Sequence, residues 1–270
     1  MIGIFDSGFG GLSIFKEIEK ELPNYDYLYL GDNARAPYGN HSQEIIYEYT
    51  KQALDYLFNQ GCHLIILACH TASAEALRKI QKEYLPRKYK NKNVLGVIRP
   101  LIEEASELTK NKVIAVLATK STVLSQTYIK ELKKKDKSIK IKQEACPLLV
   151  PLIEENLEKR VETKMILKKY IKPLKSYNPD IVILGCTHYG FLIDKIQKYF
   201  GKNTKVLDSG KIVARKLKEY LIKHKDLVKK SKEKRRIFLT TDDNLFFDKA
   251  ATKFLGRNIK SKIVKKLYEK

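Results

Sequence analysis

The chain has 270 residues and a formal net charge of +22, from 53 lysine and arginine residues against 31 acidic ones. Hydrophobic residues make up 43% of it, and no apolar run approaches the roughly 18 residues that suggest a membrane span. Residues 1–6 lack a basic segment and become a strand at once, so we expect no signal peptide and a cytoplasmic protein. The length suits one large core or two small ones.

The positive charge comes mainly from lysines that are spread along the predicted helices, with one denser stretch at residues 223–236. A charge this large attracts polyanions. However, the sequence has no arginine-rich arm and no zinc-finger spacing. We therefore interpret the charge as a lysine-covered surface and do not expect nucleic acid as a partner, with polyanion binding kept as an alternative.

Strands alternate with amphipathic helices from the start of the chain. The first strands are expected at residues 2–6, 25–30, 64–69 and 94–98. A glycine-rich turn, residues 7–11, leads into a helix that stops at Pro23, and further helices start near Ser42 and Ala72. The turn allows two interpretations. Asp6 or Ser7 caps the helix, or the glycines and the helix N-terminus bind an anion such as a carboxylate.

After Arg99-Pro100 the same alternation begins again. Strands are expected at residues 113–118, 139–143, 181–186, 204–207 and 237–240, and helices at 123–132, 151–157, 161–174, 191–200 and 245–255, with one more helix after residue 210. Repeated strand–helix units predict an α/β fold with two similar domains, largely parallel sheets flanked by helices, and a cleft between the domains. We expect the first domain to span residues 1–98 plus 207–270, and the second to span residues 99–206.

Two of the apolar strands end in a cysteine that is followed by hydroxyl and imidazole groups. One reads Leu-Ile-Ile-Leu-Ala-Cys-His-Thr over residues 64–71, and the other reads Ile-Val-Ile-Leu-Gly-Cys-Thr-His over residues 181–188. Ligands of open α/β sheets bind at this end of the strands, and a following helix N-terminus lowers a thiol pKa from about 8.5. We predict that Cys69 and Cys186 face one substrate from opposite sides, one removing a proton from a carbon and the other returning one.

The other two thiols, Cys62 and Cys146, do not end a clear strand with polar neighbours, and we expect them to be buried packing residues. Four cysteines in a chain of this length are not a disulfide framework. A zinc site is an alternative from a different functional class, although zinc ligands normally come in short paired spacings. Its ligands would be Cys69, His70, Cys186 and His188.

The motifs, taken in order, resemble those of glutamate racemases in the aspartate/glutamate racemase superfamily. They are Asp-Ser-Gly-x-Gly-Gly at residues 6–11, Pro-Tyr-Gly at 37–39, Ala-Cys-x-Thr-Ala at 68–72 and Gly-Cys-Thr-His-Tyr at 185–189. The resemblance covers nearly the whole chain and implies two related α/β domains with the active site in the cleft between them. It also implies interconversion of L- and D-glutamate without cofactor or metal, as a supply of D-glutamate for peptidoglycan and thus for cell wall biogenesis and cell shape. The expected partner is the small-molecule substrate, and a homodimer stays open.

The resemblance also assigns roles to residues. It implies that Cys69 and Cys186 are the catalytic acid–base thiols, assisted by Asp6 and His188 respectively, with Glu154 as an auxiliary glutamate. Nine further positions match substrate contacts: Ser7, Pro37, Tyr38, Gly39, His70, Thr71, Thr119, Thr122 and Thr187.

The chain departs from the family pattern at two positions. His70 stands where the family has asparagine, and Gly190 stands where it commonly has proline. We expect the turn at Gly190 to tolerate the change. The His70 ring either replaces the amide as a hydrogen-bonding group or obstructs the pocket, and a protonated ring would favour the Cys69 thiolate. We expect a tolerated substitution. A racemase of aspartate or of another amino acid, and a variant impaired by His70, remain alternatives.

Overall fold

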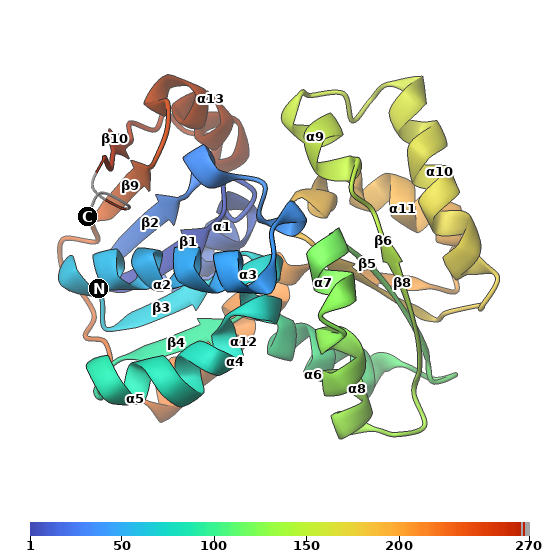
Figure 1. The fold of residues 1–270 in the computed structure, drawn as a ribbon, viewed down its shortest axis with the longest axis horizontal. Coiled ribbons are helices and arrows are strands. Elements are labelled where there is room, and N and C mark those ends of the chain that lie inside the picture. Colours follow the sequence, from blue (N-terminus) through green and yellow to red (C-terminus); the bar gives the residue numbers. More distant parts are fainter. Residues whose placement is uncertain (266, 268–270) are drawn as a thin grey trace.

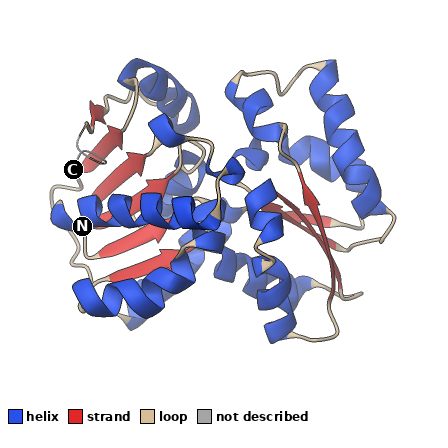
Figure 2. Cartoon of the chain, in the orientation of Figure 1, coloured by secondary structure: helices blue, strands red, loops and turns tan. Residues whose placement is uncertain are grey.

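The computed structural model describes residues 1–265 and 267. The chain folds into two α/β halves that lie side by side, each built on a parallel sheet with helices on its faces (Figures 1 and 2). The fold class predicted from the sequence is therefore confirmed. Within the described residues, no helix is long and apolar enough to cross a membrane.

The first half is built on a six-stranded sheet in which every pairing is parallel. In spatial order its strands are β10 (Lys262–Ile263), β9 (Arg236–Thr240), β2 (Tyr27–Gly31), β1 (Ile2–Asp6), β3 (Leu64–Leu67) and β4 (Asn93–Gly96). One face packs against α1 (Leu12–Glu21), α12 (Ser209–Lys223) and α13 (Asn244–Leu255). The other packs against α2 (Gln43–Asn59), α3 (His70–Glu75), α4 (Leu77–Lys79), the π-helical turn Ile80–Tyr84 and α5 (Leu85–Lys88).

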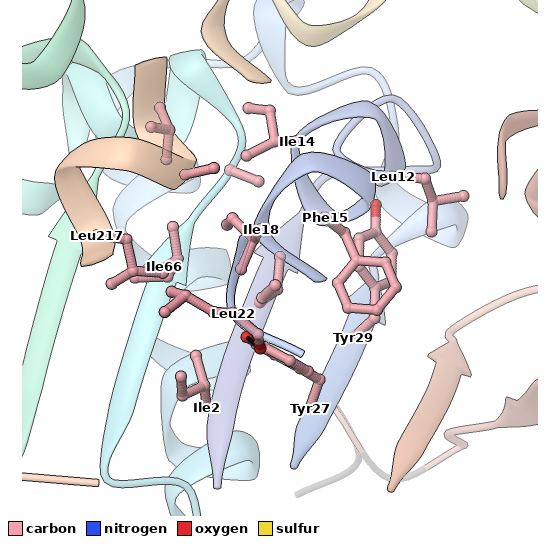
Figure 3. Packing of buried hydrophobic residues seen from close by; sticks show 14 of the residues in the cluster. Ile2, Leu12, Ile14, Phe15, Ile18, Leu22, Tyr27, Tyr29, Ile66 and Leu217 are labelled. Carbon is pink, nitrogen blue, oxygen red and sulfur yellow. Dashed lines mark hydrogen bonds between the residues drawn. The ribbon is translucent and has the colours of Figure 1, made fainter. Parts of the chain in front are cut away.

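The core of this half follows from the alternation of side chains along its strands. Ile2 and Ile4 of β1 point to the face covered by α1, whereas Phe5 points to the opposite face. Phe15 of α1 packs edge-on against Tyr27, with ring centroids 5.6 Å apart. The Phe15 ring also packs edge-on against Tyr29, with centroids 6.2 Å apart, and Figure 3 shows these side chains within the cluster.

The second half is built on a four-stranded parallel sheet. Its order is β6 (Lys140–Ala145), β5 (Val113–Ala118), β7 (Ile181–Gly185) and β8 (Lys205–Leu207). Helices α9 (Leu149–Glu154), α10 (Val161–Lys175) and α11 (Ile193–Phe200) cover one face. Helices α6 (Ile98–Leu108) and α8 (Thr127–Lys135) cover the other, and Ile212 of α12 joins that core, so α12 packs on both halves.

Helix α6 is the main error of the sequence prediction. The strand expected at residues 94–98 ends at Gly96, and Ile98 already begins a helix. Pro100 is accommodated because it lies in the first helical turn, where a backbone N–H needs no intrahelical partner. Ile98, Leu101 and Ile102 are buried on one face of this helix, a spacing that the sequence already contained.

Other helices differ from prediction in their bounds. The helix expected from residue 72 begins at His70, because the Cys69 sulfur caps it by accepting a hydrogen bond from the Ala72 N–H at 3.5 Å. The helix expected at residues 123–132 is broken into α7 (Lys120–Leu124) and α8 at Gln126, whose φ of 57° is left-handed. The helix expected at 151–157 is α9 and starts at Leu149. Strand β10 was not predicted.

Replacing Phe15 with Ala should lower the free energy of unfolding by about 3–5 kcal/mol, because it leaves a cavity in a closely packed aromatic core. Urea unfolding followed by circular dichroism measures this loss. Leu124→Ala is the control, since Leu124 is 70% exposed and its truncation should change the value by no more than about 0.5 kcal/mol. Equal effects of the two substitutions would contradict this account of the core.

Candidate functional site

A narrow cavity of about 30 Å³ lies between the two halves, and both Cys69 and Cys186 line it. Cys69 lies two residues after the end of β3, and Cys186 lies one residue after the end of β7. Each sheet therefore places one thiol at the carboxyl end of a buried strand. Ten of the other residues predicted for the site also line the cavity: Ser7, Pro37, Tyr38, Gly39, His70, Thr71, Thr119, Glu154, Thr187 and His188. Separate parts of the sequence therefore meet here as the motifs predict.

Two predicted residues lie behind this lining. Asp6 is fully buried, and Thr122 is hydrogen-bonded to lining residues instead of lining the cavity itself. Three residues that the sequence analysis did not select, Gly8, Ala36 and Val150, complete the wall. Gly8 and Ala36 adjoin predicted residues, but Val150 is an apolar residue of α9 with no distinguishing local signal.

Cys69 sits in an environment that keeps its thiol protonated. It is 5% exposed, and its sulfur donates a hydrogen bond to the Ser7 hydroxyl at 3.4 Å. Burial, together with the nearby Asp6 carboxylate, raises the pKa of Cys69 to about 12. The expectation that the helix N-terminus lowers this pKa is therefore wrong, because desolvation outweighs one N–H contact from a six-residue helix.

Asp6 ends β1 directly behind the glycine-rich turn. Its Oδ2 accepts a hydrogen bond from the Gly8 N–H at 3.1 Å, so the carboxylate stabilises the turn. The expectation that Asp6 or Ser7 caps the helix is wrong, because Gly11 is the N-cap residue of α1 and no described side chain caps that helix. Its Oδ1 is buried with no hydrogen-bond partner among the described residues. Burial raises the pKa of Asp6 above its ordinary value.

Cys186 lies at one end of a short row of titratable groups. Its sulfur is 3.8 Å from His188 Nδ1, and His188 Nε2 is 3.1 Å from Glu154 Oε1. Burial alone would lower the pKa of His188, but the contacts with Cys186 and Glu154 outweigh burial and raise it to about 10. The ring is therefore positively charged at neutral pH, beside the thiol of the second half.

The glycine-rich turn allows the two halves to approach closely. A Cβ atom at Gly10 would lie 2.5 Å from Thr187 Oγ1 and 2.7 Å from His188 Cε1. The Phe9 ring packs edge-on against the His188 ring at 5.5 Å. The glycine at position 10 thus makes room for the segment that carries Cys186, a use that differs from the close approach of a ligand expected from the sequence.

Three threonines form a hydroxyl cluster across the halves beside Cys69. Thr71 Oγ1 is 3.0 Å from Thr119 Oγ1, and the Thr119 hydroxyl donates to Thr122 at 2.9 Å. Gly39 packs on the same cluster, because a Cβ there would lie 2.7 Å from Thr119 Cβ. The cluster therefore links α3 of the first half to the N-terminus of α7 in the second.

The Pro37-Tyr38-Gly39 loop is fixed by a buried carboxylate that the sequence analysis missed. The Tyr38 hydroxyl donates to Asp32 Oδ2 at 2.5 Å, and the Thr241 hydroxyl donates to Asp32 Oδ1 at 2.8 Å. The phenol oxygen is thereby engaged with Asp32. The available signal was the position of Asp32, one residue beyond the end of β2.

His70, which stands where the family has asparagine, is buried and in hydrogen-bond contact with another side chain. Its side chain is 2% exposed, and its Nε2 lies 2.8 Å from the Ser209 hydroxyl. Burial lowers the pKa of His70 to about 3, so the ring is neutral and cannot stabilise a Cys69 thiolate by charge.

In the part of the chain that the structure describes, no group of three or more His, Cys, Asp or Glu side chains is arranged to bind a metal ion.

Comparisons with known proteins identify the family of this chain. The family model of the Asp/Glu/Hydantoin racemases matches residues 2–217. A glutamate racemase from Persephonella marina is 40% identical over 259 residues, which are 96% of this chain and 94% of that protein.

Two crystal structures are similar over almost the whole length. A glutamate racemase isoform from Bacillus anthracis matches with a TM-score of 0.91 and 31% identity, covering 100% of this chain and 98% of that one. A Francisella tularensis glutamate racemase in complex with D-glutamate matches with a TM-score of 0.89 and 32% identity, covering 99% and 97%. The chain therefore belongs to the Asp/Glu/Hydantoin racemase family and is an isomerase.

Proposed function

We propose that this chain interconverts L- and D-glutamate by two-base proton transfer between Cys69 and Cys186. The observation that carries the proposal is that two thiols from separate sheets line one cavity. Glutamate is the favoured substrate because relatives at 40% identity are named glutamate racemase, and because a structural relative is described with D-glutamate bound.

The two sulfurs together carry out both proton transfers of the reaction. One thiolate removes the α-proton from one face of glutamate and becomes a thiol, while the other thiol protonates the opposite face and becomes a thiolate. The high pKa of Cys69, about 12, favours a resting state in which this residue is the proton donor. The positive His188 ring beside Cys186 stabilises negative charge on that sulfur, and Glu154 holds the ring in place.

The α-proton of an amino acid is a very weak acid, so the site must stabilise a carbanion-like transition state. Hydroxyl and backbone N–H groups aimed at the substrate carboxylates supply this stabilisation. We propose that Asp6 assists proton exchange at Cys69, since its raised pKa suits a proton carrier. The substrate-contacting residues are Ser7, Pro37, Tyr38, Gly39, His70, Thr71, Thr119 and Thr187, with Thr122 supporting the threonine cluster.

We propose that the walls of the cavity separate to admit substrate, because a cavity of about 30 Å³ has room for only a few water molecules. We propose that residues 1–98 plus 207–270 and residues 99–206 move as two domains. The contacts that would break include Thr71 with Thr119 and the hydrogen bond from Ser121 to Glu75 at 2.6 Å. Closure then excludes water from the reacting carbon.

In the cell, the proposed role is to supply D-glutamate for peptidoglycan. A cytoplasmic location fits this role and the four free cysteines, since disulfides are rare in reducing compartments. Proton transfer by the two thiols requires no cofactor. A homodimer remains compatible with the proposal.

Replacing either proposed catalytic thiol should separate the two proton-transfer steps of the reaction. Cys69→Ser and Cys186→Ser should each reduce racemisation on the order of 10³-fold or more, because a serine hydroxyl does not ionise near neutral pH. Each variant should still eliminate HCl from one enantiomer of 3-chloroglutamate, a reaction that needs only one base. Chiral chromatography of the residual substrate identifies which enantiomer each variant consumes.

The other two cysteines provide matched controls. Cys62 and Cys146 are buried in the cores, and their substitution by Ala should leave turnover by the folded protein close to wild type. The same enantiomer preference in both serine variants, or an equal loss of elimination with both enantiomers in both variants, would contradict the assignment of one thiol to each face.

The charge on His188 should depend on Glu154. In the wild type the ring should remain protonated up to a pH of about 10, and Glu154→Gln should lower the pKa of His188 because one anionic partner is removed. NMR of ¹⁵N-labelled imidazoles measures both values, with the exposed His63 as an internal reference. A His188 ring that titrates near 6.5 in both proteins would contradict the proposed pair.

The same shift makes stability depend on pH. Because the folded-state pKa of His188 lies above its ordinary value of 6.5, its stabilising contribution is complete below about pH 6.5 and is lost as the pH rises through about 10. Glu154→Gln should move this loss to lower pH, which denaturant unfolding at a series of pH values will show. An unchanged pH dependence of stability in Glu154→Gln would contradict the proposed contribution of the His188–Glu154 pair.

A further inference from the structure

We propose that Ser209 is a positioning residue of the active site, which holds the His70 ring beside Cys69 in one orientation and one tautomer. The hydroxyl donates to His70 Nε2, so that Nδ1 carries the ring proton and donates to a carboxylate of the bound substrate. This inference rests on the proposed function, because it places glutamate in the cavity that His70 lines.

The contact joins the first residues of two helices from distant parts of the chain. His70 begins α3 and Ser209 begins α12. Ser209 Oγ is 2.8 Å from His70 Nε2, and Ser209 is 1% exposed, so water does not compete for the bond. Because His70 directly follows Cys69, the orientation of its ring is set within one residue of a reacting sulfur.

In a neutral imidazole, this one hydrogen bond determines which ring nitrogen carries the hydrogen. Such a ring has one donor nitrogen and one acceptor nitrogen, and the burial of His70 keeps it neutral. An Nε2 that accepts from Ser209 leaves the hydrogen on Nδ1. That nitrogen is buried and has no hydrogen-bond partner among the described residues. A buried donor without a partner in a site that takes a dicarboxylate is matched to a carboxylate oxygen.

The turn that carries Ser209 adjoins both positions where the chain departs from the family pattern. Asp208 caps α12 by accepting a hydrogen bond from the Gly210 N–H at 3.3 Å. Its Oδ1 would lie only 3.1 Å from a Cβ atom at Gly190. The glycine at 190 therefore leaves room for the capping carboxylate, while Ser209 of the same turn takes the histidine. The two departures therefore meet at one structural junction, the turn that carries Asp208 and Ser209.

A double-mutant cycle on the full-length chain tests whether Ser209 acts through His70. Ser209→Ala should lower kcat/KM for glutamate roughly tenfold, mainly through KM, because the lost contact orients a group that binds substrate. In the His70→Asn background the same substitution should change kcat/KM by less than about twofold. Ser209→Thr retains a hydroxyl and should recover most of the activity.

Ser121→Ala is the matched control for loss of a buried serine hydroxyl. Its hydroxyl donates to Glu75 across the halves and does not contact His70, so its effect should be the same in both backgrounds. Melting temperatures of all variants show whether they fold. Equal losses of kcat/KM for Ser209→Ala in the two backgrounds, or no loss in the wild-type background, would overturn the proposal.

The tautomer provides a readout that does not depend on turnover. ¹⁵N NMR of His70 should show the hydrogen on Nδ1 in the wild type and a mixture of tautomers in Ser209→Ala. A hydrogen on Nε2 in a wild type that racemises glutamate would overturn this inference alone. A wild type that does not racemise glutamate would overturn the proposed function, and with it the carboxylate contact, whatever the tautomer.

Discussion

The site depends on how closely the polar turns of the two halves can approach each other. Gly10 leaves no side chain between the glycine-rich turn and the Thr187-His188 segment, and Gly39 does the same beside Thr119. A Cβ at either glycine would fall within 2.7 Å of an atom of the opposite half, so the halves would have to separate. This close approach is what allows thiols carried by two independent sheets to line one small cavity.

The two thiols occupy similar positions in the fold but different electrostatic environments. Cys69 is enclosed near the buried Asp6 carboxylate, which together with desolvation raises its pKa to about 12. Cys186 instead faces a positively charged His188 that is paired with Glu154. A reaction that passes protons between two sulfurs can use this asymmetry, because the high pKa of Cys69 keeps a proton on that sulfur at rest.

Local sequence patterns predicted most of the fold, because buried parallel strands form short apolar runs and surface helices repeat at 3.6 residues. Helix α6 was missed since Arg99-Pro100 was interpreted as a break, although Pro100 falls where a helix tolerates it. The motifs predicted residues that line one cavity between the halves, but they did not predict the partners of those residues. The contact of His70 with Ser209 and the high pKa of Cys69 arise from tertiary burial, for which the sequence carries no local signal.

The most direct test of the two-thiol account is the fate of the α-hydrogen when each enantiomer of glutamate is converted in D₂O. At low conversion, the product enantiomer should contain deuterium at the α-carbon, while recovered substrate should retain protium, because the face that is protonated differs from the face that lost its proton. The same pattern should hold from either direction. Deuterium appearing in recovered substrate as fast as in product, or protium carried over into product, would indicate a single base and contradict the account.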